Sequence, residues 1–415
     1  MWEHNTKTHV FGNGLTLVIE PMSDVKSAAF SLLVPAGCVY DPPDECGAAA
    51  VLSDLITRGA GDRDHKELSA ALDNLGIQRS ESVGSTHLTF TGAALADNLP
   101  DAMRIYGDIL RRPHLPPNQF EAARSGVEQS LLAVEDEPRQ KVMLELRRRC
   151  YNDPWGRPTE GTLEGVAALR PETPREHYQR YVRPNGTILG IAGRVDVEET
   201  IETVGEIFQD WEQLPVPEFD VGQAGTQHDH IHHDSVQTHI GIAYESVPYR
   251  HEDYYAAWAA VSVLSGGMSS RLFTEVRERR GLCYAVSASL NSLREEARVL
   301  CYAGTTSEKA QQTLDVTLEE LIKIGDGIEQ SELDRCKARA KSSLIMQQES
   351  TFARSSSIAR DWFHRGQVTP LAEIREKIEG LTIETVLSYI HQHPARDFTI
   401  LTIGPTPLEV PRAVS

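Results

Sequence analysis

Basic residues are scarce in this sequence, and it has no apolar run long enough to cross a membrane. Lys and Arg number 41 against 60 Asp and Glu, so the formal net charge is -19. Such a surplus of negative charge repels nucleic acids and anionic lipid surfaces and favours solubility. The best apolar run, residues 28–40, is interrupted by Pro35 and is too short to span a bilayer. We therefore expect neither nucleic acid nor membrane among the partners.

Paired cysteines and a secretion signal are missing as well. The N-terminus has no basic segment followed by an apolar one, which is the pattern of a signal peptide. Scattered cysteines without a C-x-x-C pair are typical of reduced thiols in a reducing compartment. We therefore expect a cytoplasmic protein, although a leader trimmed earlier would leave no trace here. The six cysteines are Cys38, Cys46, Cys150, Cys283, Cys301 and Cys336.

The remaining composition is that of a globular protein with more than one domain. Apolar residues make up 40% of the chain and charged residues 24%, and 415 residues suffice for two or three domains. The segment 212–225, EQLPVPEFDVGQAG, is rich in proline and glycine and has no periodicity, which is typical of a linker. We predict an N-terminal domain over 1–215, a linker over 216–225 and a C-terminal domain over 226–415.

The expected helices and strands follow the same order in both parts of the chain. Leu115 to Pro138 and Ile328 to Ser350 match at an offset of about 213 residues, which indicates duplication of one unit. We predict an α+β fold with two homologous domains, each a mixed, mainly antiparallel sheet packed on one face by helices. Among the expected elements are helices over 47–56, 138–150, 174–181 with Thr173 as its cap, 197–211 and 269–280, and strands over 83–91 and 284–289.

One stretch, SSRLFTEVRERRGLCYAV, places an arginine and a tyrosine where chemistry can use them. Arg277 lies on the expected helix 269–280, Gly281 is suited to cap it, and Tyr284 begins the next strand. A guanidinium can hold a peptide carbonyl, and a phenol can donate to the oxyanion of a tetrahedral intermediate. Spacing alone favours a plainer interpretation, with Arg277 solvated on its helix and the hydroxyl of Tyr284 satisfied within the sheet.

Histidines are concentrated in the run QHDHIHHD at residues 227–234. A strand there would place His228, His230 and His232 on one face, because side chains alternate along a strand. Three imidazoles could bind zinc. The alternative is an exposed strand at the edge of the linker, without a metal.

The order of these motifs resembles the insulinase and pitrilysin family of zinc peptidases, and the size resembles the two-domain bacterial members and the mitochondrial processing peptidase subunits. The resemblance covers essentially the whole chain. In active members, the first long helix carries His-x-x-Glu-His, whose histidines hold zinc while the glutamate activates water. The segments that carry the resemblance are NGLTLVIE, the helix entered at Gly47, DPWGRPTEGT, YVRPNGTILGIAGRVD and SSRLFTEVRERRGLCYAV.

The resemblance implies that the zinc positions are lost in this chain. Ala50 and Asp54 stand at the two histidine positions, and Ser53 stands at the glutamate. The third ligand of the family, a glutamate on a later helix, falls at or next to Ser130. Glu128 is two residues away, about 200° around a helix, so it faces elsewhere. We therefore expect no cofactor in this chain.

Arg277 and Tyr284 match the motif that the family's C-terminal domain supplies to the substrate. The resemblance therefore implies a catalytic role for both in a zinc-free subunit of a heterodimeric metallopeptidase. Its partner would be a homologous subunit that bears His-x-x-Glu-His and holds the zinc, and its substrate a peptide or small protein. The alternatives are an inactive scaffold or peptide-binding homologue, like the core subunits of the cytochrome bc1 complex, and a homodimer with a vestigial site.

Overall fold

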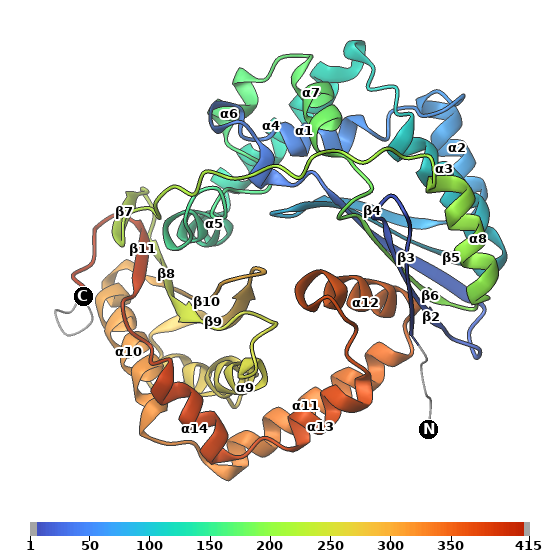
Figure 1. Cartoon of the computed structure of the whole chain (residues 1–415). Coiled ribbons are helices and arrows are strands. Elements are labelled where there is room, and N and C mark those ends of the chain that lie inside the picture. The colour runs from blue at the N-terminus through green and yellow to red at the C-terminus, as the bar shows by residue number, and fades with distance from the viewer. Residues whose placement is uncertain (1–5, 411–415) are drawn as a thin grey trace. The chain divides into compact units, whose positions relative to one another are not determined.

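In the computed structural model, which describes residues 6–410, the chain forms two compact units (Figure 1). Unit 1 takes the residues up to Ala133 together with Arg157–Val221 and Met346–Thr369. Unit 2 takes Val134–Gly156, Gly222–Ile345 and the residues from Pro370 onward. Each unit contains one mixed sheet with helices, which confirms the predicted α+β fold with two domains.

The sheet of unit 1 has six strands in the order β1-β2-β6-β3-β5-β4. All neighbours are antiparallel except β2 and β6, which run parallel. This single parallel pair is what makes the sheet mixed. The strands are β1 (Lys7–Val10), β2 (Thr16–Pro21), β3 (Ser27–Pro35), β4 (Gln78–Val83), β5 (His87–Leu95) and β6 (Ile188–Gly193).

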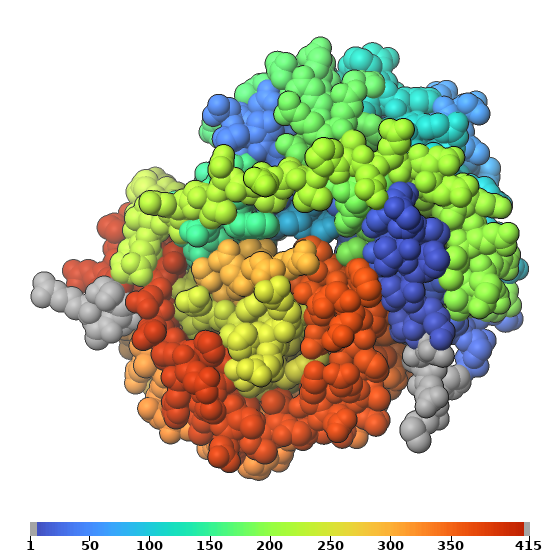
Figure 2. Space-filling view, in the orientation of Figure 1, coloured from blue at the N-terminus to red at the C-terminus, as the bar shows by residue number. Residues whose placement is uncertain are grey.

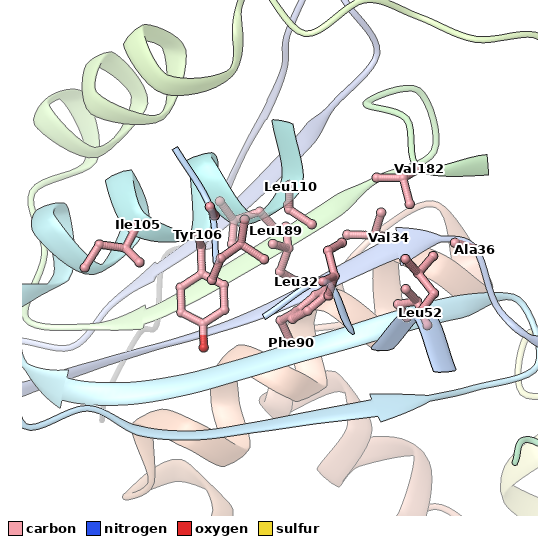
Figure 3. Close-up of a cluster of buried hydrophobic side chains, with 14 of the residues drawn as sticks. Leu32, Val34, Ala36, Leu52, Phe90, Ile105, Tyr106, Leu110, Val182 and Leu189 are labelled. Atoms are coloured by element: carbon pink, nitrogen blue, oxygen red, sulfur yellow. The ribbon is translucent and has the colours of Figure 1, made fainter. Parts of the chain in front are cut away.

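Most helices of unit 1 cover one face of this sheet. Alternate residues of β3, among them Phe30, Leu32 and Val34, are fully buried, and Tyr106 of α3 meets Phe30 at a ring-centroid distance of 4.7 Å. Figure 3 shows Leu32, Val34 and Tyr106 within this core. The helices are α1 (Ala48–Leu55), α2 (His65–Asn74), α3 (Leu99–Arg111), α4 (Phe120–Glu135), α6 (Leu163–Ala168), α7 (Thr173–Tyr181), α8 (Val197–Phe208) and α12 (Thr351–Arg365), and short 3₁₀ turns span Cys38–Tyr40, Pro43–Glu45, Ala96–Asn98 and Pro117–Gln119.

The second face of the same sheet carries α12, which the sequence patterns did not predict. Its Ile358 and Ala359 pack on Val18 and Ile188, which point away from the main core. Next to this contact, Arg354 donates two hydrogen bonds, of 2.7 and 2.6 Å, to the carboxylate of Glu20 on β2. Both side chains are buried, so the pair is a charged contact inside the unit.

The sheet of unit 2 repeats this arrangement with five strands in the order β7-β11-β8-β10-β9. The pair β7 and β11 is parallel, and the other neighbours are antiparallel. The strands are β7 (His228–His232), β8 (Gln237–Ser246), β9 (Cys283–Ser292), β10 (Ala297–Thr306) and β11 (Thr399–Gly404), and the helices are α5 (Pro138–Cys150), α9 (Tyr254–Ser265), η5 (Phe273–Arg279), α10 (Ala310–Lys323), α11 (Gln330–Gln348), α13 (Leu371–Glu379) and α14 (Ile383–Gln392), with 3₁₀ turns at Ser307–Lys309 and Ile324–Asp326.

Helix α5 lies on one face of this second sheet, although it precedes the linker in sequence. Its Val142 and Leu146 are fully buried against residues of β8, β10 and β11, among them Ala243 and Leu300. Gly241 on β8 leaves room for both side chains, since a Cβ there would lie 3.3 Å from each. Alternate residues of the same strands form the other core with α9, α10 and α14.

Three local predictions are corrected by the structure. The strand expected over 83–91 is a hairpin, in which β4 and β5 are joined at residues 84–86. Thr173 is the first residue of α7 and not its cap, because Glu172 holds that position. The helix expected over 197–211 ends at Phe208. The helix expected over 138–150 has the bounds of α5.

The linker segment has no regular secondary structure between residues 211 and 226, and its residues 212–221 are exposed or half-buried (Figure 2). All strands of the first sheet precede it, and all strands of the second follow it. The domain boundaries at 215 and 226 stay a prediction. Between residues 6 and 410, no helix combines the length and the apolar character needed to cross a membrane.

Candidate functional site

The first candidate region is α1 of unit 1, which is held at its start by a buried carboxylate. Asp41 accepts hydrogen bonds from the backbone N–H groups of Gly47 and Ala49, at 2.7 and 2.9 Å. Burial raises the pKa of Asp41 to about 7, against the lowering effect of these bonds. Gly47 has φ of 121°, and a Cβ there would lie 2.5 Å from the side chain of Val166. The entry to α1 therefore requires glycine.

The three positions of α1 that correspond to the zinc motif do not fit a metal. Ala50 has no ligand atom, and Ala50 and Ser53 are both buried. The Asp54 carboxylate is engaged by Arg58, whose Nη2 lies 3.2 Å from Oδ2 and whose Nε also donates to it. A zinc ion there would find one carboxylate already paired with a guanidinium, which is no ligand set for this metal.

Helix α4 nevertheless lies beside α1, where a third ligand would be expected. Asp54 Oδ2 is 4.0 Å from the place a Cβ would take on Gly126, one helical turn before Ser130. The hydroxyl of Ser130 donates to the carbonyl of Gly126 at 3.1 Å. The backbone arrangement is therefore that of a site between two helices, but its side chains are committed to each other and to the backbone.

The histidine run forms the edge strand β7, with alternate side chains on alternate faces. Nδ1 of His230 lies 2.8 Å from the hydroxyl of Thr402, and burial, followed by the nearby His232, lowers the pKa of His230. The Nε2 atoms of His228 and His230 are buried without a hydrogen-bond partner in the described part of the chain. Across residues 6–410, no group of three or more His, Cys, Asp or Glu side chains is placed to hold a metal ion.

The second candidate region, in unit 2, begins with an irregular helix. After residues 271–272 the backbone widens into the π-helix η5, so the expected regular helix over 269–280 is wrong in its geometry. Arg271 fixes the start of this segment through hydrogen bonds of 2.7 Å from Nε and Nη2 to the two carboxylate oxygens of Glu332. Gly281, with φ of 56°, closes the end, and its N–H donates to the carbonyl of Arg277 at 3.1 Å. π-Helices are rare and occur frequently at functional sites.

Arg277 lies within η5 and is exposed. Its guanidinium lies 4.7 Å from the centroid of the Phe273 ring, which orients the side chain without using its hydrogen-bond donors. The neighbouring Arg279 and Arg280 both pair with Glu275. Arg277 itself makes no ion pair with any residue between 6 and 410. Its donors therefore remain available to a ligand.

Tyr284 lies on β9 at a second irregularity. Thr305 of β10 pairs with Cys283 and Gly304 pairs with Ala285, so Tyr284 is the extra residue of a β-bulge. Bulges re-aim side chains and are common next to active sites. Tyr284 is 45% exposed, and its hydroxyl donates to Oε1 of Gln237 on β8 at 2.9 Å.

Three residues that the sequence did not single out hold the Tyr284 hydroxyl in place. Tyr302 on β10 hydrogen-bonds to Tyr284, and burial, more than this bond, raises the pKa of Tyr302 above its usual range. Nδ1 of His239 lies 2.9 Å from the Tyr302 hydroxyl. A Cβ on Gly304 would lie within 2.5 Å of both tyrosine oxygens, so only glycine fits. Strand pairing alone brings these residues together, and no sequence spacing reveals it.

The two candidate regions, one in each unit, differ in what they can do. On α1, the Asp54 carboxylate is paired with Arg58, and Ser53, at the position expected for a water-activating glutamate, carries no carboxylate. Arg277 and Tyr284 present a guanidinium and a phenol, which can bind a peptide carbonyl and stabilise an oxyanion. Arg277 and Tyr284 are thus suited to bind and polarise a substrate, while neither can generate a hydrolytic nucleophile.

Comparison with known proteins points to one family. Residues 17–163 match the family model described as "Insulinase (Peptidase family M16)", and residues 169–340 match "Peptidase M16 inactive domain". An uncharacterized zinc protease of Bacillus subtilis is 24% identical and covers 96% of this chain and 98% of its own. Two solved structures, an M16 inactive domain of Pseudomonas fluorescens and a protease of Helicobacter pylori, are 18% identical and have TM-scores of 0.88 and 0.86; they cover 98% of this chain and 99% and 100% of theirs.

Proposed function

This chain belongs to the insulinase family of M16 peptidases, and we propose that it is the zinc-free subunit of a heterodimeric metallopeptidase. In this proposal Arg277 and Tyr284 bind the substrate and stabilise the transition state at a zinc site on a homologous partner. The partner bears His-x-x-Glu-His and supplies the metal and the base. The substrates are peptides or small proteins, and both subunits act in the cytoplasm.

One observation carries the proposal. Within the eight residues from Arg277 to Tyr284, the chain departs twice from regular secondary structure, with Arg277 in a π-helix and Tyr284 in a β-bulge. Irregular backbone costs free energy and usually persists where a side chain must be aimed at a ligand. The positions 50, 53 and 54 carry no such feature, because they lie within the α-helix α1, and Asp54 is in addition paired with Arg58. The retained geometry is therefore the part that acts on another polypeptide.

The local chemistry supports a role for Arg277 in binding a carbonyl. Its neighbours Arg279 and Arg280 are held by Glu275, so Arg277 differs from them in having unused donors. A stack on Phe273 limits its conformations, which lowers the entropy lost when a substrate binds. Tyr284 is held similarly by Gln237.

The test is reconstitution. This chain and a homologue with His-x-x-Glu-His from the same cell are purified separately and mixed, and cleavage of a fluorogenic peptide and zinc content are measured. We expect no stoichiometric zinc and no cleavage with this chain alone, and chelator-sensitive cleavage with the mixture. The Arg277→Ala chain should reduce turnover by about a hundredfold or more. Arg279→Ala, an equally charged loss on the same helix, is the matched control and should change turnover less than twofold.

A second candidate is a scaffold or peptide-binding homologue without a catalytic role. The observation that favours it is the hydrogen bond from Tyr284 to Gln237, which satisfies the phenol within its own sheet. Full activity of a mixture that contains Arg277→Ala would support this scaffold. If the chain alone bound one zinc ion and cleaved peptides in a chelator-sensitive way, both candidates would be wrong.

A further inference from the structure

Three neighbouring strands of unit 2 meet at the hydroxyl of Tyr284. Strand β10 lies between β8 and β9, so Tyr284 on β9 reaches across β10 to contact Gln237 on β8. It crosses at Gly304, where a Cβ would lie within 2.5 Å of both the Tyr302 oxygen and the Tyr284 oxygen. The missing side chain of Gly304 therefore leaves the space in which the two hydroxyl groups meet.

We propose that His239 and Tyr302 are positioning residues, whose hydrogen bonds hold the Tyr284 oxygen in place and leave its proton free to move to a substrate oxyanion. Nδ1 of His239 lies 2.9 Å from the Tyr302 hydroxyl, and Tyr302 in turn hydrogen-bonds to Tyr284. The chain of hydrogen bonds ends on Oε1 of Gln237, 2.9 Å from the Tyr284 hydroxyl. This inference rests on the proposed function, because it concerns how Tyr284 serves a substrate.

The direction of the chain follows from the number of protons. A phenol carries one proton, and Tyr284 donates its proton to Gln237. The Tyr284 oxygen therefore accepts in its bond with Tyr302, and Tyr302 donates. The single proton of Tyr302 is then used as well, so the Tyr302 oxygen accepts from Nδ1 of His239. His239 is thus the tautomer that carries its proton on Nδ1.

The surroundings keep both buried members of the chain in the required protonation state. Burial, followed by the nearby His233, lowers the pKa of His239, so its imidazole is neutral at neutral pH. Burial, more than the hydrogen bond in the chain, raises the pKa of Tyr302, so this residue keeps the proton that it donates. Cys283 of β9 raises this pKa further, and the Arg139 guanidinium of α5, 5.0 Å from the ring centroid, lowers it without outweighing burial.

The chain separates two tasks that a lone hydroxyl would have to combine. The bond from Tyr302 fixes the Tyr284 oxygen without using the Tyr284 proton. That proton can turn from Gln237 to the oxyanion of a substrate, because only one hydrogen bond has to be exchanged. Since hydrogen bonds in a chain polarise one another, a phenol that accepts from a second phenol is also a stronger donor. Tyr302 and His239 are buried, so they act through Tyr284.

The first test is NMR of the isolated full chain with isotope-labelled histidine and tyrosine. We expect the His239 proton on Nδ1, and a displaced ring resonance of Tyr284 in the variant Tyr302→Phe; Tyr284→Phe identifies that resonance. Tyr244→Phe removes a hydroxyl from the opposite face of the same sheet and is the matched control, which should leave the resonance in place. A His239 proton on Nε2, or a Tyr284 resonance that Tyr302→Phe does not move, overturns the proposal.

The second test is the kinetics of the reconstituted mixture, with circular dichroism to verify that each variant is folded. Tyr302→Phe should lower kcat about tenfold and change KM less than about twofold, because the bond matters most when Tyr284 donates to the oxyanion. His239→Leu should lower kcat about threefold. His239→Asn should restore most of this loss, since its amide offers a donor near the position of Nδ1. Tyr244→Phe should leave both constants unchanged.

The two tests separate this proposal from the proposed function. If the wild-type mixture is active and Tyr302→Phe lowers only the melting temperature, with kcat unchanged, the chain has a purely structural role and the proposal is overturned. If the wild-type mixture cleaves nothing, the proposed function fails, and with it the catalytic use of Tyr284. The NMR result then still decides whether the chain of hydrogen bonds exists, because it needs no partner subunit.

Discussion

Helices α5 and α12 occupy equivalent places on two different sheets. They begin at Pro138 and Thr351, about 213 residues apart, and each directly follows a long helix, α4 or α11. Helix α5 comes from the first part of the sequence and lies on the sheet of unit 2, whereas α12 comes from the second part and lies on the sheet of unit 1. Each part of the sequence thus supplies a helix to the sheet that the other part forms.

The two contacts are built from different chemistry. Helix α12 adds a buried ion pair, Arg354 with Glu20, to its apolar contacts, whereas α5 is seated through the apolar side chains Val142 and Leu146. The charged groups of α5 are not part of this apolar contact. Among them, Arg149 forms ion pairs with Glu145 and Asp229. A helix at this place on the sheet can therefore be held by more than one kind of side-chain contact. A buried charge tolerates fewer substitutions, since its partner must stay present.

The largest expected effect is the loss of Arg354. Arg354→Ala leaves the Glu20 carboxylate buried and without its guanidinium, which should lower the free energy of unfolding by about 3–5 kcal/mol. Urea denaturation followed by circular dichroism measures this change. Arg360→Ala, at an exposed position of the same helix, is the control and should cost less than about 1 kcal/mol.

The ion pair of Glu20 and Arg354 can be replaced by an apolar contact like that of α5. The double variant Glu20→Leu and Arg354→Met replaces both charges by apolar groups, so it should recover most of the stability that Arg354→Ala loses. A double variant as unstable as the single one would mean that the ion pair is needed for more than mutual neutralisation.

The second prediction compares the glycines under the two helices. A Cβ on Gly190 would lie 2.4 Å from the backbone oxygen of Ser355 in α12, which cannot move without displacing the helix. A Cβ on Gly241 would lie 3.3 Å from side-chain ends of Val142 and Leu146, which can adjust. Gly190→Ala should cost about 2–3 kcal/mol, and Gly241→Ala less than about 1 kcal/mol. If both variants lowered the melting temperature equally, α12 and α5 would tolerate an added methyl group beneath them to the same extent.

A smaller effect is expected when the ion pairs of Arg149 on α5 are removed. Arg149 donates to Glu145 at 2.6 Å and to Asp229 at 2.6 and 2.9 Å, and its side chain is mostly buried. Because Asp229 is more than a third exposed, solvent screens part of this interaction. Arg149→Ala should therefore cost about 1–2 kcal/mol, less than Arg354→Ala. Thermal unfolding of the two variants side by side gives the ranking.

The smallest expected effect is a dependence of the folding stability on pH. Burial alone would raise the pKa of Glu145, but hydrogen bonds from Arg149 and Arg148 outweigh it and lower the pKa; a hydrogen bond from Arg149 lowers the pKa of Asp229. A carboxylate whose pKa is lowered by folding stabilises the fold above its ordinary pKa and loses this contribution as the pH falls. The difference in stability between wild type and Arg149→Ala should therefore shrink below about pH 4. A constant difference down to pH 3 would contradict this.

Sequence patterns predicted the part of the fold that is governed by apolar periodicity and proline. The bounds of α5 follow from Pro138 at its first turn and from its regular pattern. Helix α12 was missed because its sheet-facing side mixes Arg354 and Ser355 with Ile358, which resembles no apolar stripe. The strand β4 was merged with β5 because its residues, QRSESV, are almost all polar at an exposed edge.

The candidate site, like the fold, could be predicted from the sequence only in part. A linear motif identifies Arg277 and Tyr284, since both lie in one continuous segment. The π-helix and the β-bulge that aim them depend on how that segment meets its neighbours, Gly281 and β10, and spacing does not encode this. The contact of Tyr284 with Gln237 and Tyr302 joins three strands, so it becomes visible only when their pairing is known.

The exchange of α5 and α12 also sets an order of events during synthesis. The last strand of the first sheet ends at Gly193, but the helix that covers its second face begins at Thr351. Until that helix leaves the ribosome, Val18, Leu33 and Ile188 and the carboxylate of Glu20 have nothing from α12 to cover them. Nascent chains with exposed apolar strands bind chaperones or aggregate. We expect unit 1 to finish folding only after α12 has been synthesised.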